Sequence, residues 1–125
     1  MIDHLKLHVA DPARSRAFYE QALAPLGYRV LLDHPASVGM GAKRPDFFIA
    51  PAEGAPKPVH VAFRADSEYD VDAFHAAALA AGGTDNGGPG PRPHYHQNYY
   101  SAFVLDADGN NVEAVYHGVM QPGAA

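Results

Sequence analysis

The sequence has no cysteine, no long apolar run and no excess of basic residues. The absence of cysteine excludes disulfides, cysteine nucleophiles and thiolate ligands to a metal. No apolar run approaches the roughly 20 residues that a membrane-spanning helix needs, and the first residues, MIDHLKLH, lack the apolar core of a signal peptide. A net charge of −5 without a basic patch argues against nucleic acid as a partner. We therefore expect a cytoplasmic protein with no membrane or nucleic-acid partner.

The residues that are present are typical of one globular domain. The chain has 125 residues, of which 47% are hydrophobic and 18% are charged, so it can bury a core of its own. It also has eight histidines, a high count for this length. Histidine serves both as a metal ligand and in acid–base chemistry, so the positions of these residues are worth following.

The clearest pattern is an internal repeat with an offset of 56 residues. Two strand-like stretches, 2–9 (IDHLKLHV) and 59–65 (VHVAFRA), each carry a histidine near the start, His4 and His60. Alternate residues of a strand share one face, so Lys6 and His8 follow His4, and Ala62 and Arg64 follow His60. The same offset relates Phe18 to Phe74, Ala22 to Ala78, Leu23 to Leu79 and Gly27 to Gly83. Such a repeat predicts two copies of one strand–helix unit with two equivalent histidines.

The first copy, residues 1–50, has the order β-α-β-β-β. Asp11-Pro12 is typical of a helix start, with Asp as the N-cap and Pro in the first turn. Pro25 and Gly27 end the helix. Three short strands are then expected at 28–33, 37–40 and 46–50.

The second copy is expected at 59–117, after a proline-rich linker at 51–58 and before a tail at 118–125. Asp70 is expected to cap a helix from Val71 to about Ala81. The glycine- and proline-rich stretch that follows is incompatible with a helix or a central strand, so we expect a loop. The remaining elements are expected to be that loop at 87–93, strand at 95–105, a hairpin turn at Asp108-Gly109 and a last strand at 111–116.

Strands outnumber helices and gather after each helix, which predicts an α+β fold rather than a doubly wound parallel sheet. We expect two βαβββ modules that form a cupped, mostly antiparallel sheet around a cleft.

Three stretches connect this pattern with a known family. They are HLKLHVADPARSRAFY at 4–19, PVHVAF at 58–63 and FVLDADGNNVEAV at 103–115, of which the D-x-D-G-N-x-x-E run is the most specific. In these stretches the chain resembles the glyoxalase / bleomycin-resistance / extradiol-dioxygenase superfamily, also called vicinal oxygen chelate proteins. The resemblance implies paired βαβββ modules around one divalent metal ion and a homodimer, as in many small bacterial members.

The resemblance also implies a set of metal ligands. Carried over by position, the ligands are His4, His60 and Glu113, with Glu113 also the catalytic residue. The fourth position of the family falls at Phe48 or Ile49, neither of which binds a metal, so the sequence departs from the four-ligand pattern. Two imidazoles and a carboxylate suit iron, manganese, nickel, cobalt or zinc, and three ligands leave room for substrate oxygens.

Further residues are candidates for a substrate pocket: His8, Arg64, His94, His96 and Tyr100. The H-x-H pair His94 and His96 is also a metal site in its own right on an alternative interpretation. Tyr99, Tyr100 and Tyr116 are candidate hydrogen-bond donors in the cleft, although a strand tyrosine is more often a core residue with a polar tip. We interpret His34, His75 and His117 as surface residues.

Three functions remain open at this point. The first is a metal-dependent enzyme on a small oxygen-chelating substrate, whether a lyase or isomerase, a dioxygenase or a thiol transferase. The second is a non-catalytic protein that binds a small molecule, like the bleomycin-sequestering members of the family. The third is a structural dimer with a vestigial site.

Overall fold

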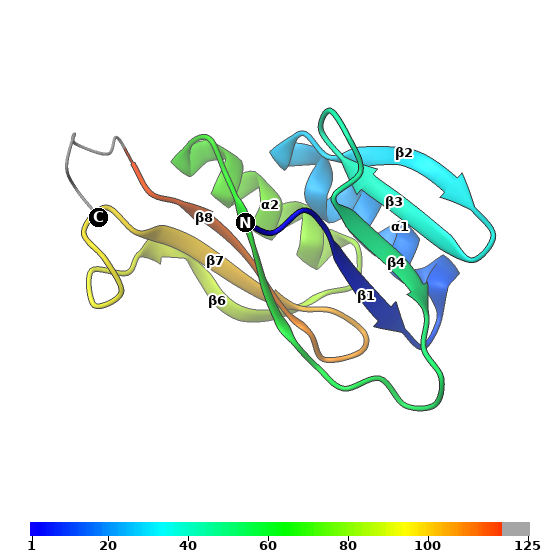
Figure 1. Cartoon of the computed structure of the whole chain (residues 1–125). Coiled ribbons are helices and arrows are strands. Elements are labelled where there is room, and N and C mark those ends of the chain that lie inside the picture. The colour runs from blue at the N-terminus through cyan, green and yellow to red at the C-terminus, as the bar shows by residue number, and fades with distance from the viewer. Residues whose placement is uncertain (119–125) are drawn as a thin grey trace.

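The computed structural model describes residues 1–118 as two βαβββ modules that lie side by side (Figure 1). Module one contains β1 (Leu5–Val9), α1 (Pro12–Leu23), a short 3₁₀ helix (Ala24–Leu26), β2 (Arg29–His34), β3 (Ser37–Gly41) and β4 (Phe47–Pro51). Module two contains β5 (His60–Arg64), α2 (Glu68–Ala80), β6 (Thr84–Pro91), β7 (Tyr100–Leu105) and β8 (Asn111–Tyr116). The predicted tail falls, from residue 119 on, outside the described residues.

Each module forms its own four-stranded sheet, with the strand orders β1-β4-β3-β2 and β5-β8-β7-β6. The pairs β1–β4 and β5–β8 are parallel, and the other pairs are antiparallel. The first strand of each module therefore lies next to its last strand. This confirms the predicted α+β class with two modules and mostly antiparallel pairing.

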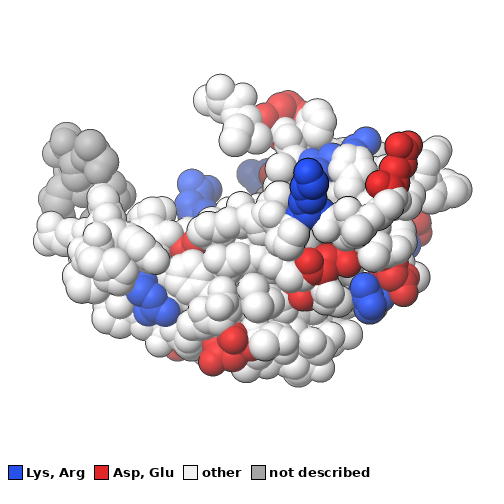
Figure 2. Space-filling model, turned by 90° about the horizontal axis from the view of Figure 1, so that it is seen from below, with Lys and Arg blue, Asp and Glu red and all other residues white. Residues whose placement is uncertain are grey.

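One face of each sheet is buried beneath the helices. Leu7 and Val9 of β1 and Phe47 and Ile49 of β4 are buried in the core, and α1 and α2 lie on the same side of the two sheets (Figure 1). The alternate residues of β1 point to the other face and are exposed. The edge-on view in Figure 2 shows the molecule hollowed along its upper side, with acidic and basic residues scattered rather than gathered by sign.

Local signals explain where both helices begin. The Asp11 side chain accepts a hydrogen bond from the Arg14 backbone N–H at 3.2 Å, so Asp11 is the predicted N-cap of α1. The prediction for α2 is wrong, because Ser67 rather than Asp70 is its cap. The Ser67 hydroxyl accepts from the Asp70 N–H at 3.0 Å. Asp70 instead lies in the first turn, where a negative charge complements the helix dipole.

The glycine- and proline-rich stretch after α2 is mostly strand, so the predicted loop at 87–93 is wrong. Most of it belongs to β6, an edge strand with register shifts on either side of Gly87. An edge strand needs hydrogen bonds on one side only and tolerates proline and bulges there. The predicted strand at 95–99 is also wrong, since these residues form a turn in which Asn98 has a φ of 66°.

An apolar seam joins the two modules. The Phe47 ring of β4 packs edge-on against Phe63 of β5, with ring centres 5.1 Å apart, and Tyr28 also packs edge-on against Phe63, at 5.7 Å. Burial and a hydrogen bond to Asp46 raise the pKa of Tyr28 to about 12.

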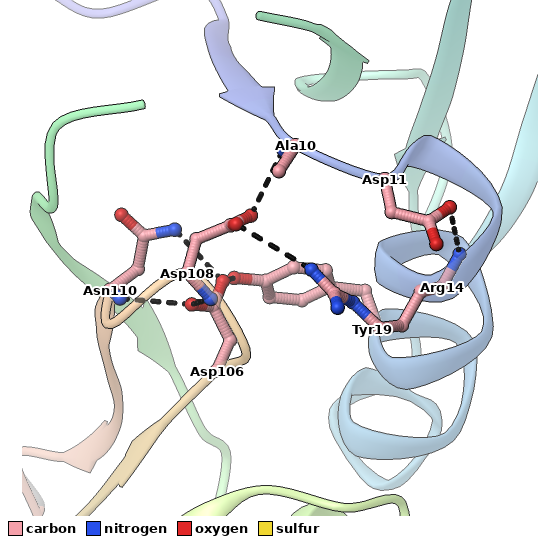
Figure 3. Close-up of polar contacts among 7 residues, drawn as sticks. All are labelled: Ala10, Asp11, Arg14, Tyr19, Asp106, Asp108 and Asn110. Carbon is pink, nitrogen blue, oxygen red and sulfur yellow. Dashed lines mark hydrogen bonds and ion pairs between the residues drawn. The ribbon is translucent and has the colours of Figure 1, made fainter. Parts of the chain in front are cut away.

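A buried polar network around Asp106 forms the second connection between the modules (Figure 3). The hydroxyl of Tyr19, on α1 of module one, donates to Asp106 Oδ2 at 2.6 Å, and the Asn110 side-chain amide donates to the same oxygen at 2.9 Å. Asp106 Oδ1 accepts from the backbone N–H groups of Asp108 and Asn110. Tyr19 and Asn110 are almost fully buried, so every one of these bonds replaces lost hydration.

Neighbouring contacts extend this connection to the start of α1 in module one and to the residue before β5 in module two. Asp108 accepts from the Ala10 N–H at 3.4 Å and lies 3.7 Å from the Arg14 guanidinium (Figure 3). The Asn110 side-chain oxygen accepts from the Val59 N–H at 2.9 Å, just before β5. The first part of the D-x-D-G-N-x-x-E run therefore holds the modules together, and its last residue, Glu113, lies on the opposite face of β8 from the buried Val112 and Ala114.

We expect Tyr19→Phe to destabilise the protein by about 1–3 kcal/mol, because it leaves a buried carboxylate oxygen without one of its donors. Urea unfolding at neutral pH measures this. Tyr69→Phe is the control, since Tyr69 is 78% exposed and loses no buried contact. A Tyr19→Phe stability equal to that of the control variant would contradict the structural role of the network.

We also expect the free energy of unfolding to fall as the pH rises from about 10 to about 12. The pKa of Tyr28 is raised from 10.0 to about 12, so the unfolded chain loses this proton first and gains stability relative to the folded chain. Urea midpoints of wild type and Tyr28→Phe at pH 8 and pH 11 measure the effect. The variant should lose less stability than wild type over this interval, and an equal loss would contradict the assignment.

Candidate functional site

The candidate site is centred on Glu113, in the middle of β8 on the open face of module two. The register places Glu113 between Ala62 of β5 and Phe103 of β7. Although this face is open, the Glu113 residue is only 1% exposed. A carboxylate taken out of water in this way requires hydrogen-bond partners or a counter-charge.

Two side chains from different elements supply these partners. His60, the first residue of β5, places Nε2 at 2.7 Å from Glu113 Oε1. Tyr99, the last residue before β7, donates its hydroxyl proton to Glu113 Oε2. The parallel pairing of β5 with β8 brings the histidine to the carboxylate, and the turn at 92–99 brings the tyrosine over it.

Tyr99 remains protonated at neutral pH. Burial and the hydrogen bond to Glu113 raise the pKa of its hydroxyl above the usual range of a tyrosine. It is therefore a fixed hydrogen-bond donor to the carboxylate rather than a base. The Phe103 ring, 6.1 Å from the His60 ring between centres, forms the apolar floor next to the pair.

A cavity of about 680 Å³ begins at Tyr99 and continues along the same part of module two. It is lined by Arg64, Asp66, His96, Tyr99, Tyr116 and His117, among others. His117, which we interpreted as a surface residue, is half-buried here, and its ring lies 5.2 Å from that of Tyr99. The position of a histidine just after a strand gave no sign of this.

His4 lies apart from the His60–Glu113 pair. Its Nδ1 is 2.8 Å from the Asp3 carboxylate, its ring packs against Phe48 at 5.5 Å, and its side chain is 53% exposed. His4 and His60 both line a 390 Å³ cavity at the seam between the modules, but Glu113 does not. Among residues 1–118 there is no group of three or more histidine, aspartate or glutamate side chains that could hold a metal ion. One chain therefore brings together only two of the three predicted ligands.

Phe48 occupies the place in module one that Glu113 occupies in module two. Lys6 pairs with Phe48 across β1 and β4, and Ala62, the repeat equivalent of Lys6, pairs with Glu113 across β5 and β8. Of the two residues considered from the sequence for the fourth ligand position, the register therefore selects Phe48. This position has an aromatic ring and no donor.

The remaining predicted pocket residues are dispersed. Arg64 and His96 line the 680 Å³ cavity, whereas His8 is exposed on β1 and His94 is exposed with its ring against Tyr95. Tyr100 points to the helix side of β7 and donates to Asp72 of α2 at 2.7 Å. It is therefore Tyr99, and not Tyr100, that reaches Glu113.

A family profile of the Glyoxalase/Bleomycin resistance protein/Dioxygenase superfamily matches residues 1–114. The chain belongs to this superfamily. Among solved structures, a glyoxalase/bleomycin resistance protein from Albidiferax ferrireducens T118 is 30% identical, with a TM-score of 0.78 over 91% of this chain and 96% of that one. Among curated proteins, none matches the sequence significantly.

Two solved structures of lower identity share the fold. Lactoylglutathione lyase from Agrobacterium tumefaciens is 22% identical, with a TM-score of 0.70 over 93% of this chain and 92% of that one. TioX from Micromonospora sp. ML1 is 17% identical, with a TM-score of 0.68 over 94% and 97% of the two chains. In the described part of this superfamily member, no helix is long and apolar enough to cross a membrane.

Proposed function

We propose that the protein is a divalent-metal-dependent enzyme that acts on a small oxygen-chelating molecule at Glu113. The observation that carries this proposal is the contact between His60 Nε2 and the buried Glu113 carboxylate at 2.7 Å. Tyr99, which donates to the same carboxylate, lines an open cavity. Superfamily membership supports it, because one of the structural relatives is named as a lyase. We further propose that the protein acts in the cytoplasm as a homodimer.

The donor chemistry of the pair suits a metal ion. An imidazole nitrogen and a carboxylate oxygen are ligands of divalent iron, manganese, nickel, cobalt and zinc. A buried carboxylate is also stabilised by a cation, and a divalent ion supplies more charge than a protonated histidine does. When bound, the ion would polarise an oxygen of the ligand. His60 and Glu113 would hold it from this chain.

We propose that the partner subunit's His4 completes the ligand set. Within one chain, His4 is held on module one by Asp3 and Phe48, away from Glu113. The open faces of the two modules are equivalent by the repeat, and module one exposes Leu32 and partly exposes Phe48 there. A second copy that laid this face over module two would cover apolar surface and bring its histidine towards His60.

The other residues of the cluster position Glu113 and exclude water from it. Tyr99 donates to Oε2, which leaves Oε1 directed at His60. Because the tyrosine hydroxyl keeps its proton, it holds the carboxylate in place as a ligand or a proton acceptor. Phe103 closes one side of the pair. Lyase or isomerase chemistry, dioxygenation and thiol transfer all use a substrate oxygen that a metal ion at this carboxylate would polarise.

The second candidate function is binding of a small molecule without catalysis. The aromatic ring of Phe48 at the fourth ligand position favours this alternative, because it removes a donor that the module-two counterpart keeps. Metal content separates the two functions.

We expect the purified, untagged protein to bind about one divalent ion per chain when iron(II), manganese(II), nickel(II) or zinc(II) is supplied separately. Glu113→Gln and His60→Ala should lose the ion, because each removes one of the two donors that meet in the site. His94→Ala is the control, since His94 is exposed outside the cluster. Elemental analysis measures the metal content per chain. Equal metal content in all variants, or no metal in wild type, would favour the non-catalytic binding function instead.

We also expect a mixture of His4→Ala and Glu113→Gln chains, unfolded and refolded together, to recover metal binding that neither variant has alone. A mixed dimer would contain one site with an intact histidine from one chain and an intact carboxylate from the other, giving about one ion per four chains after random pairing. Elemental analysis of the mixture tests this. No recovery, with both variants dimeric, would place all the ligands in one chain.

A further inference from the structure

Among residues 1–118, Arg92 is the one arginine whose guanidinium lies over an aromatic ring, that of Phe103 next to Glu113. Its guanidinium carbon lies 5.5 Å from the centre of the Phe103 ring. Phe103 pairs with Glu113 across β7 and β8, so the guanidinium lies within roughly two strand spacings, or 10 Å, of the carboxylate. The position is on the open face, beside the proposed metal ligands.

The glycines of β6 form the cradle that holds this guanidinium. Nη2 donates to the Gly88 carbonyl at 2.7 Å and Nη1 to the Pro91 carbonyl at 3.4 Å. A Cβ at Gly90 would lie 3.1 Å from Nη1, and one at Gly87 would lie 3.5 Å from Nη2 and 3.0 Å from Phe103. The G-G-P-G-P-R run therefore leaves the space that the arginine occupies, which gives the unusual composition of this edge strand a physical reason.

The charge of Arg92 is fixed but not neutralised. Its hydrogen bonds go to carbonyl oxygens, and among residues 1–118 no carboxylate lies within ion-pair distance of it.

We propose that Arg92 binds the anionic group of the substrate and that the substrate is a small carboxylate with an oxygen function at its other end. A guanidinium binds a carboxylate through paired, charge-assisted hydrogen bonds, and Arg92 is already ordered by β6 and Phe103. The oxygen function then lies at His60 and Glu113. The ring of Tyr99, which lines the open cavity, favours an aromatic or otherwise planar body between the two ends. This inference rests on the proposed function in placing the ligand at Glu113.

The test compares the binding of 4-hydroxybenzoate and its methyl ester to the full-length protein by isothermal titration calorimetry at neutral pH and low salt. The two probes share a planar ring and a hydroxyl, and only the first carries a negative charge. We expect wild type to bind the acid at least about tenfold more tightly than the ester, as a charge-assisted pair provides. Arg92→Gln should lose this preference, while Arg29→Gln, an exposed arginine of module one, should keep it.

A second pair of variants separates ligand recognition from a structural role of Arg92. Gly90→Val places a side chain against the guanidinium, whereas a Cβ at Gly88 meets nothing within 4 Å, so Gly88→Val is its matched control. Gly90→Val should reduce the preference for the acid and leave binding of the ester unchanged. These variants keep the arginine, so they remain informative if Arg92→Gln does not fold.

Three results would overturn the proposal: equal affinity of wild type for the two probes, no binding of either, or a preference for the acid that survives in both Arg92→Gln and Gly90→Val. Metal content distinguishes this failure from that of the proposed function. Arg92→Gln should retain the ion that Glu113→Gln loses. If Arg92→Gln loses the preference for the acid and wild type contains no metal, Arg92 is the anion-binding residue of a protein without the proposed metal chemistry.

Discussion

The buried carboxylate of Asp106 is the constraint on which the rest of the structure depends. It receives hydrogen bonds from the Tyr19 hydroxyl of module one and from the turn that leads into β8. These bonds fix where β8 starts relative to the other module, and Glu113 is the third residue of that strand. Because a buried carboxylate is costly without its donors, the two modules and the turn are held as a unit. The position of the site is therefore set by a contact on the opposite side of the sheet.

Much of the fold follows from short-range patterns. Alternation within 2–9 and 59–65 and the Asp11-Pro12 start depend only on neighbouring residues, so they can be recognised in the sequence. The 56-residue offset shows that the same local pattern occurs twice, which predicts two βαβββ modules. The errors occur where the surroundings decide. Glycine and proline discourage a central strand, but β6 is an edge and has a guanidinium packed on it. Asp70 is a good cap by type, but Ser67 comes first and has the extended backbone that a cap requires.

The site was partly predictable for the same reason. The side-chain contact between His60 and Glu113 follows once β5 and β8 are neighbours, which the repeat and the family motif imply. The separation of His4 from this pair does not follow, since it depends on how the two modules pack. The choice between Tyr99 and Tyr100 depends on which residue begins β7, because a shift of one residue moves a side chain to the other face. No sequence pattern indicated a role for Arg92, because its guanidinium occupies a space that exists only where the glycines of β6 have no side chains.

The replacement of a carboxylate by Phe48 makes the two halves of the repeat chemically unequal. Module two presents carboxylate oxygens at this position, and module one presents an aromatic ring. A perfectly symmetric repeat would offer a ligand two indistinguishable ways to bind. Here, a molecule bound between the open face of module one and that of module two would contact the Phe48 ring on one side and the Glu113 carboxylate on the other. The structure thus distinguishes the two orientations of a single ligand, and for a prochiral substrate it would distinguish the two faces of the reacting centre.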